Sequence, residues 1–107
     1  MITAIFIDAE SQNVTLLEKF DCNLKSLYEK TNCENVGIFY YKEHGFYYDD
    51  ETYPEHHKNF WSMPEFEQWI GGNTLIVSAQ TDEEGKELSV KPNFIDFIKK
   101  HIEFKSI

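Results

Sequence analysis

The aromatic residues of this chain are concentrated in one segment, and this concentration constrains the fold more than any other feature. Eleven of the seventeen aromatic residues lie between positions 39 and 69. The β-rich runs at 36–41 and 46–48, joined by residues 42–45, predict a hairpin. Because neighbouring residues of a strand point to opposite faces, one core cannot bury all of these rings. Either residues 53–70 fold back as a second layer, or several rings stay exposed.

Further strands are expected on both sides of this hairpin. Residues 2–7 are apolar on both alternating faces, which is typical of a central strand covered on both sides. After a polar turn at 10–13, residues 14–20 form a β-rich run that pairs with the first as a hairpin. Three later strands are expected, at 74–79, at a short return around Glu87–Leu88 and at an edge position near 103–105.

Two main helices are expected, at about 23–32 and 92–102. Asn23 can cap the first helix, and Asn32 tolerates the left-handed conformation that ends it. Pro92 suits the first turn of the second helix, and apolar residues at spacings of three and four give that helix one inner face.

A capping box predicts a third, short helix. Ser62 is followed three positions later by Glu65, which fits the pattern and predicts a helix at 63–70. Together the elements predict an α+β fold, with the two main helices packed on a mostly antiparallel sheet. A chain of this length, with no linker or repeat, is expected to form a single compact domain over residues 1–107.

The charge of the chain excludes some partners. Nineteen acidic residues face ten basic ones, all of them lysine, for a formal net charge of −9. This charge disfavours direct binding to nucleic acid or to an anionic membrane, and it favours a basic partner. The lack of arginine argues against a phosphoryl-transfer site that depends on one. No signal peptide or membrane span is expected, so the protein is predicted to be cytoplasmic.

No motif in the sequence indicates catalysis. Cys22 and Cys33 lack the spacing of a disulfide framework or a zinc quartet, so buried free thiols are expected. His56 and His57 follow several acidic residues and are candidates for a metal site. Adjacent histidines need not point the same way, and a solvated polar loop is the favoured interpretation. The sequence therefore predicts a protein that is not an enzyme and needs no cofactor or metal.

Four features in order resemble a family of small proteins of unknown function encoded in bacterial genomes, prophages and phages. They are the opening strand Ile2–Asp8, the helix end with Leu27, Tyr28 and Cys33, the segment Gly71–Val77, and the turn Asp82–Gly85. The resemblance implies a cytoplasmic, phage-borne or bacterial protein. It carries over no catalytic or binding residue, and the aromatic region 46–69 departs most from the family's pattern.

The aromatic region is the strongest candidate for a binding surface. Tyrosine and tryptophan are favoured anchors of protein interfaces, and an acidic rim attracts a basic partner. The predicted partner-binding anchors are Tyr40, Tyr47, Tyr48, Tyr53 and Trp61, and the predicted acidic rim is Asp49, Asp50, Glu51 and Glu55.

Three functions compete at this stage. The first is an acidic protein-binding module, in one version a phage-encoded inhibitor that mimics nucleic acid and occupies a basic nucleic-acid-handling host or defence protein. The second is a self-associating structural domain whose aromatic patch closes a homodimer. The third is a small metal-binding protein or enzyme that uses His56 and His57.

Overall fold

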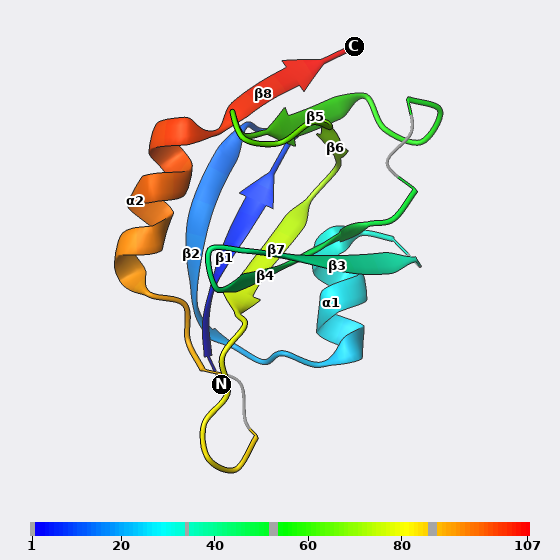
Figure 1. The fold of residues 1–107 in the computed structure, drawn as a ribbon. Helices are drawn as coiled ribbons and strands as arrows, with labels where there is room; N and C mark the ends of the chain where they lie inside the picture. Colours follow the sequence, from blue (N-terminus) through cyan, green and yellow to red (C-terminus); the bar gives the residue numbers. More distant parts are fainter. Residues whose placement is uncertain (1, 34, 52–53, 86–87) are drawn as a thin grey trace.

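Eight strands form two antiparallel sheets, and two helices cover opposite faces of the larger sheet (Figure 1). The computed structural model describes residues 2–33, 35–51, 54–85 and 88–107, and these counts refer to them. The larger sheet has the strand order β2-β1-β7-β4-β3, and the smaller has the order β6-β5-β8. The predicted α+β class and the mostly antiparallel pairing are therefore confirmed.

The bounds of the elements agree with most of the sequence predictions. The strands of the larger sheet are β1 (Ile2–Asp8), β2 (Asn13–Phe20), β3 (Val36–Tyr41), β4 (His44–Asp49) and β7 (Thr74–Ser78). The strands of the smaller sheet are β5 (Asn59–Ser62), β6 (Ile70–Gly71) and β8 (Glu103–Ser106), and the helices are α1 (Leu24–Thr31) and α2 (Pro92–His101).

Strand β1 is a central strand covered on both faces, as its apolar sequence predicts. It pairs with β2 on one side and with β7 on the other. Ile5 and Ile7 belong to the core on the α2 side, whereas Ala4 belongs to the core on the α1 side. All three side chains are completely buried.

Helix α1 is defined by its two asparagine caps. The side-chain oxygen of Asn23 accepts a hydrogen bond from the backbone N–H of Ser26 at 2.9 Å, and Asn32 ends the helix with a φ of 54°. Leu27 turns inward and packs with Leu75 and Val77 of β7. The predicted helix at 23–32 is therefore confirmed within one residue at each end.

Helix α2 covers the opposite face of the sheet, together with the smaller sheet (Figure 1). Phe94 and Ile98 turn inward and join the same core as Phe46 of β4 and Trp61 of β5. Trp61 is completely buried, and its indole N–H donates a hydrogen bond of 2.8 Å to the Thr74 hydroxyl. The fold-back of the chain after the hairpin thus supplies the second layer that was one of the two alternatives.

The predicted short helix at 63–70 is wrong. Residues 63–69 form a turn-rich loop that leads into β6, and the N–H of Phe66 donates to the carbonyl of Met63 at 2.9 Å. The Ser62 hydroxyl donates to the carbonyl of Gln68 at 2.9 Å, so it closes the loop and caps no helix. Of the predicted return strand, Glu87 lies outside the described residues, and the Leu88 N–H donates to the Gln80 carbonyl at 3.3 Å.

Candidate functional site

The larger sheet ends in two edge strands, and these differ in how they are protected. The edge strand β2 has a bulge, because Ile2 pairs with Phe20 whereas Ala4 pairs with Leu17, and Lys19 within it has a φ of 60°. Bulges and lysines on an edge strand hinder pairing with another chain. The other edge strand, β3, keeps a continuous register along its whole length and contains no lysine.

The register of the β3–β4 hairpin decides which backbone groups of β3 face outward. Lys42 and Glu43 form a two-residue turn with φ values of 49° and 65°. The pair that flanks such a turn, Tyr41 and His44, exchanges backbone hydrogen bonds, and every second pair does the same. The N–H and C=O groups of the alternate residues Val36, Ile38 and Tyr40 therefore point to the open edge, where no described strand pairs with them.

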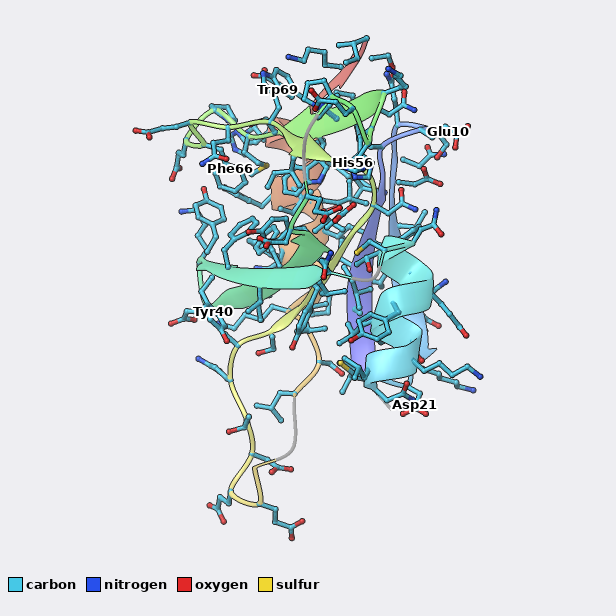
Figure 2. All side chains as sticks on the ribbon, turned by 90° about the vertical axis from the view of Figure 1, so that its right-hand side faces the viewer. Glu10, Asp21, Tyr40, His56, Phe66 and Trp69 are labelled. Carbon is cyan, nitrogen blue, oxygen red and sulfur yellow. The ribbon has the colours of Figure 1, made fainter. Side chains whose placement is uncertain are left out.

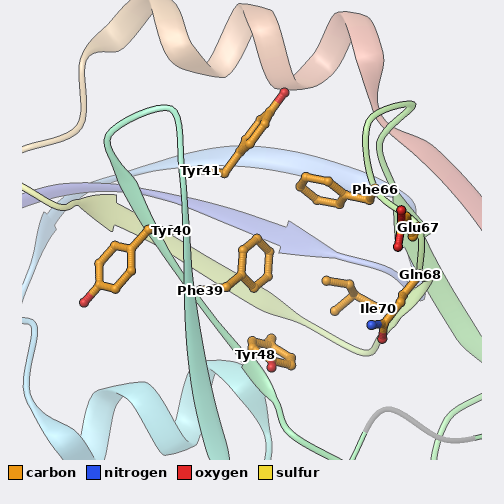
Figure 3. Close-up of a pocket in the computed structure, with 8 residues that line it drawn as sticks. All are labelled: Phe39, Tyr40, Tyr41, Tyr48, Phe66, Glu67, Gln68 and Ile70. Atoms are coloured by element: carbon orange, nitrogen blue, oxygen red, sulfur yellow. The ribbon is translucent and has the colours of Figure 1, made fainter.

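A groove of about 360 Å³ runs beside this open edge (Figure 3). One wall is β3 with the neighbouring part of β4, and the other wall is the loop between β5 and β6. The residues that line the groove are Phe39, Tyr40, Tyr41, Tyr48, Phe66, Glu67, Gln68 and Ile70. We call this cavity the β3 groove.

Aromatic contacts fix the walls of the β3 groove. The Phe39 ring lies 5.4 Å from the Tyr48 ring and 5.6 Å from the Phe66 ring, both in edge-to-face geometry. Such pairs are favourable beyond the area that they bury. Figure 3 shows the Phe39, Tyr48 and Ile70 side chains converging on the groove, while the Tyr40 ring points to the other face of the strand. The groove is thus preformed in the chain without a partner.

Three carboxylates stand around the β3 groove, and we call them the acidic rim. Glu67 lines the groove directly. Burial raises the pKa of the Tyr48 hydroxyl, and the neighbouring Asp50 carboxylate raises it further, which places Asp50 beside this ring. Glu65 stands beside Tyr41 in the same way. All three acids are solvent-exposed, so their carboxylates are accessible to a basic partner.

The predicted partner-binding anchors do not share one surface, because neighbouring residues of a strand point to opposite faces. Tyr40 is 68% exposed on β3, and Figure 2 shows it on the same side of the molecule as Phe66, away from α1. Tyr48 lines the β3 groove, but Tyr47 points to the opposite face and packs against the core beneath α1. The prediction that Trp61 is an exposed anchor is wrong, because the second layer buries it. Tyr53 lies outside the described residues.

The four acids predicted from the sequence, Asp49, Asp50, Glu51 and Glu55, do not all lie at the groove. Asp49 is 7% exposed, so the prediction that it contributes to an exposed rim is wrong. One oxygen of Asp49 lies 2.7 Å from Nε2 of His57, and the other accepts the backbone N–H of Glu51 at 2.9 Å. Glu51 turns toward His56, at 3.7 Å, and toward the Asn35 amide. Glu55 is exposed but does not line the groove.

His57 is held in place between Asp49 and the backbone of Gly71 and Gly72. Its ring lies against the backbone of Gly71 and Gly72, since a methyl group on either glycine would come within 2.7 Å of a ring atom. Asp49 holds the ring by its Nε2 atom at 2.7 Å. Among the described residues, no group of three side chains of the metal-ligating types comes together.

The cysteines show no sign of an activated thiolate. Neither forms a disulfide, and both are half-buried rather than fully buried as the sequence predicts. The Cys33 thiol donates to the Thr31 hydroxyl at 3.2 Å. Burial raises the pKa of the Cys33 thiol. The Thr31 hydrogen bond lowers this pKa by less, and the Asp49 carboxylate raises it further. Since the thiolate is the nucleophile, this raised pKa favours the less reactive thiol form of Cys33.

Tyr41 has a buried hydroxyl that makes no hydrogen bond of good geometry among the described residues, although the Glu65 carboxylate lies near it. Burial, followed by the nearby Glu65 carboxylate, raises the pKa of Tyr41 to about 12. The folded state therefore favours the neutral phenol, and an unfolded tyrosine ionises first as the pH rises above about 10. Stability linked to Tyr41 is present below pH 10 and is lost as the pH rises through about 12.

We expect the Tyr41→Phe variant to be more stable than the parent by about 1 kcal/mol at neutral pH, because it removes an unsatisfied buried hydroxyl. It should also lose less stability than the parent when the pH rises from about 10 to about 12. Urea unfolding at several pH values measures both effects. A variant that is less stable at neutral pH would show that the hydroxyl is hydrogen-bonded after all.

Of the eight residues that line the β3 groove, the sequence predicted only Tyr40 and Tyr48 as partner-binding residues. Phe66, Gln68 and Ile70 come from a segment predicted to be helical, so their position opposite β3 was not expected. Phe39 was counted among the aromatic residues but not among the anchors. The alternation along β3 is the signal that separates Phe39 from Tyr40, but the wall opposite them depends on tertiary packing.

The chain matches no protein-family model, no curated protein and no solved structure. None of the helices in the described part of the chain has the length and apolar character that crossing a membrane requires. The geometry and charge of this molecule are therefore what indicate its function.

Proposed function

We propose that the protein is a non-enzymatic binding module that takes an extended segment of a partner protein as an added strand along β3. The observation that carries this proposal is the unprotected edge of β3, whose free backbone groups lie directly beside a preformed aromatic groove. In strand addition, main-chain hydrogen bonds supply affinity and pockets for alternate side chains supply specificity. Val36, Ile38 and Tyr40 offer the main-chain groups.

The two faces of β3 define what an added strand must carry. Alternate side chains of that strand enter the β3 groove beside Phe39 and Phe66, and apolar residues suit this position. Side chains on the other face lie next to Ile38 and Tyr40, which are 39% and 68% exposed. Tyrosine is a frequent hot-spot residue in interfaces, so Tyr40 is the expected energetic anchor on that face.

The negative charge around the β3 groove determines which kind of partner segment it favours. The acidic rim of Asp50, Glu65 and Glu67 and the net charge of −9 favour a basic segment. A second copy of this chain on β3 would bring two such rims together, which costs free energy. A basic nucleic-acid-handling protein has the required chemistry, and inhibition of such a host or defence protein by charge mimicry is the form of this function that the family resemblance favours.

Two synthetic peptides test the proposal directly. One alternates valine with lysine and the other alternates valine with glutamate, and fluorescence anisotropy measures binding of each. We expect saturable binding of the lysine peptide, with affinity that falls as the salt concentration rises. Light scattering of the protein alone tests whether a second copy of this chain occupies β3 instead. Equal binding of both peptides, or a concentration-dependent dimer without peptide, would overturn the choice of a basic partner segment.

Reversing the charge of two acidic-rim residues should weaken binding of the lysine peptide. The double variant Asp50→Lys with Glu67→Lys changes the formal net charge from −9 to −5, since each reversal adds two charges. We expect at least about a tenfold loss of affinity at low salt and a much smaller difference at high salt. The matched control, Glu18→Lys with Glu29→Lys, makes the same change in net charge away from the groove. If both variants lose affinity equally, the rim has no local role.

A further inference from the structure

A second cavity, of about 270 Å³, lies where helix α2 begins. It shares no lining residue with the β3 groove, and its occupant is independent of the proposed binding function. The residues that line it are Lys42, His44, Lys91, Asn93, Phe94 and Phe97. We call it the α2 cavity. It stands out because it gathers cationic and hydrogen-bonding groups in a strongly acidic protein.

His44 is the central polar group of the α2 cavity. It is only 4% exposed, and its ring stacks on Phe94 with the ring centres 3.8 Å apart. Nδ1 lies 2.7 Å from the carbonyl oxygen of Lys42, so Nδ1 carries the proton and donates to that oxygen. Nε2 is then an acceptor with a free lone pair. Within the described chain no group donates to Nε2, although the residue lines the cavity.

Charged side chains lie around this acceptor. The Lys42 ammonium lies 5.2 Å from the Phe97 ring centre, which holds it over one wall of the cavity. The Lys91 ammonium lies 3.6 Å from a Glu43 oxygen, and it is close enough to His44 to lower its pKa, after the larger lowering by burial. The Glu43 carboxylate acts in the opposite direction on His44, but more weakly than Lys91.

The backbone at the start of α2 adds one donor. Pro92 has no N–H group, and the Phe94 N–H already donates to the Lys91 carbonyl at 2.9 Å. The Asn93 N–H is the remaining group of this first turn, and the described hydrogen bonds leave it unpaired. The first N–H groups of a helix commonly bind an anion because they lack an intrahelical partner.

We propose that the α2 cavity binds an oxyanion that also carries a hydrogen-bond donor, with hydrogen phosphate as the simplest ligand. Its anionic oxygens accept from Lys42, Lys91 and the Asn93 N–H. Its hydroxyl donates to Nε2 of His44, an acceptor lining the cavity to which no described group donates. Sulfate and the dianion of a phosphomonoester supply the oxygens but not the hydroxyl, so the site discriminates against both.

The chemical shifts of the His44 imidazole in NMR spectra test this proposal without any knowledge of a biological ligand. Inorganic phosphate, sulfate and methyl phosphate are titrated separately above about pH 7.5, where the ester is a dianion. We expect saturable shifts of His44 with phosphate, and at least about tenfold weaker binding of the other two anions. Sulfate binding should strengthen when the pH is lowered until Nε2 becomes protonated.

Three variants separate a specific site from a general effect of ions. Lys91→Ala removes an exposed ammonium and should weaken phosphate binding at least about tenfold, whereas Lys25→Ala on α1 should leave it unchanged. His44→Phe keeps the stack on Phe94 and should abolish the preference for phosphate over sulfate, read from the Asn93 amide signal. Absence of a His44 shift, equal shifts with sulfate, or undiminished binding by the Lys91→Ala variant would each overturn the proposal.

Discussion

Replacing Gly71 with alanine is expected to lower the free energy of unfolding by about 2–3 kcal/mol, toward the upper end of what overpacking costs. The melting temperature should fall by roughly 10 °C in a domain of this size. The physical reason is steric, because the added methyl group would lie 2.7 Å from Cδ2, 2.8 Å from Cγ and 2.9 Å from Cβ of His57. His57 cannot move aside without breaking its 2.7 Å contact with the buried Asp49 carboxylate.

A double-mutant cycle isolates this contact. In the His57→Ala background, which has its own cost because Asp49 loses a partner, Gly71→Ala should be nearly neutral. Gly85→Ala is the matched control, since Gly85 has a φ of 83° but nothing within 4 Å of the added methyl group. Its cost, about 1 kcal/mol from backbone strain, should not change in the His57→Ala background. Additive costs of Gly71→Ala and His57→Ala would contradict the packing described for this ring.

Ile38→Pro is expected to weaken binding of the valine–lysine peptide by about 2 kcal/mol, or roughly thirtyfold in Kd. Proline removes the outward N–H of Ile38, which an added strand would need as a donor, and its ring obstructs the approaching chain. The same N–H makes no bond to β4, so the hairpin keeps its ladder. Proline is tolerated in edge strands for this reason, and the loss of stability should stay below about 1 kcal/mol.

The control for this variant is Ile38→Ala, which shortens the side chain and keeps the N–H group. We expect its affinity to lie between that of the parent and that of Ile38→Pro. Thermal unfolding shows whether the proline variant is folded, and Tyr40→Pro, which removes another outward N–H, serves as a second variant if it is not. Equal affinities of the alanine and proline variants would mean that the peptide binds through side chains alone.

The sequence predicted best the elements that local chemistry determines. The two helices were found because asparagine caps and an N-terminal proline act within one turn. The central position of β1 was found because its residues are apolar on both faces. The helix at 63–70 failed because the capping-box pattern competes with a tertiary contact, in which the Ser62 hydroxyl bonds the Gln68 carbonyl instead. Pattern reasoning has no information about such a partner.

The candidate site was predicted only in part, for a related reason. Tyr40 and Asp50 were placed correctly on an exposed surface by their residue type and position in the hairpin. Trp61 and Asp49 belong to the same residue types, but they are buried because distant partners, the Thr74 hydroxyl and the His57 ring, satisfy their polar atoms. Whether a polar aromatic residue or an acid is exposed therefore depends on contacts that span many residues along the chain.

The position of β7 also has a consequence for how the chain reaches its native state. Two local hairpins, β1–β2 and β3–β4, are joined in the larger sheet by β7, which follows both of them in the sequence. Each hairpin by itself is only marginally stable, because two strands bury too little apolar surface until further strands or a helix pack with them. The two hairpins can therefore join into the larger sheet only after β7 has been synthesised as far as Ser78. Formation of that sheet depends on non-local strand pairing, which takes on the order of milliseconds to seconds.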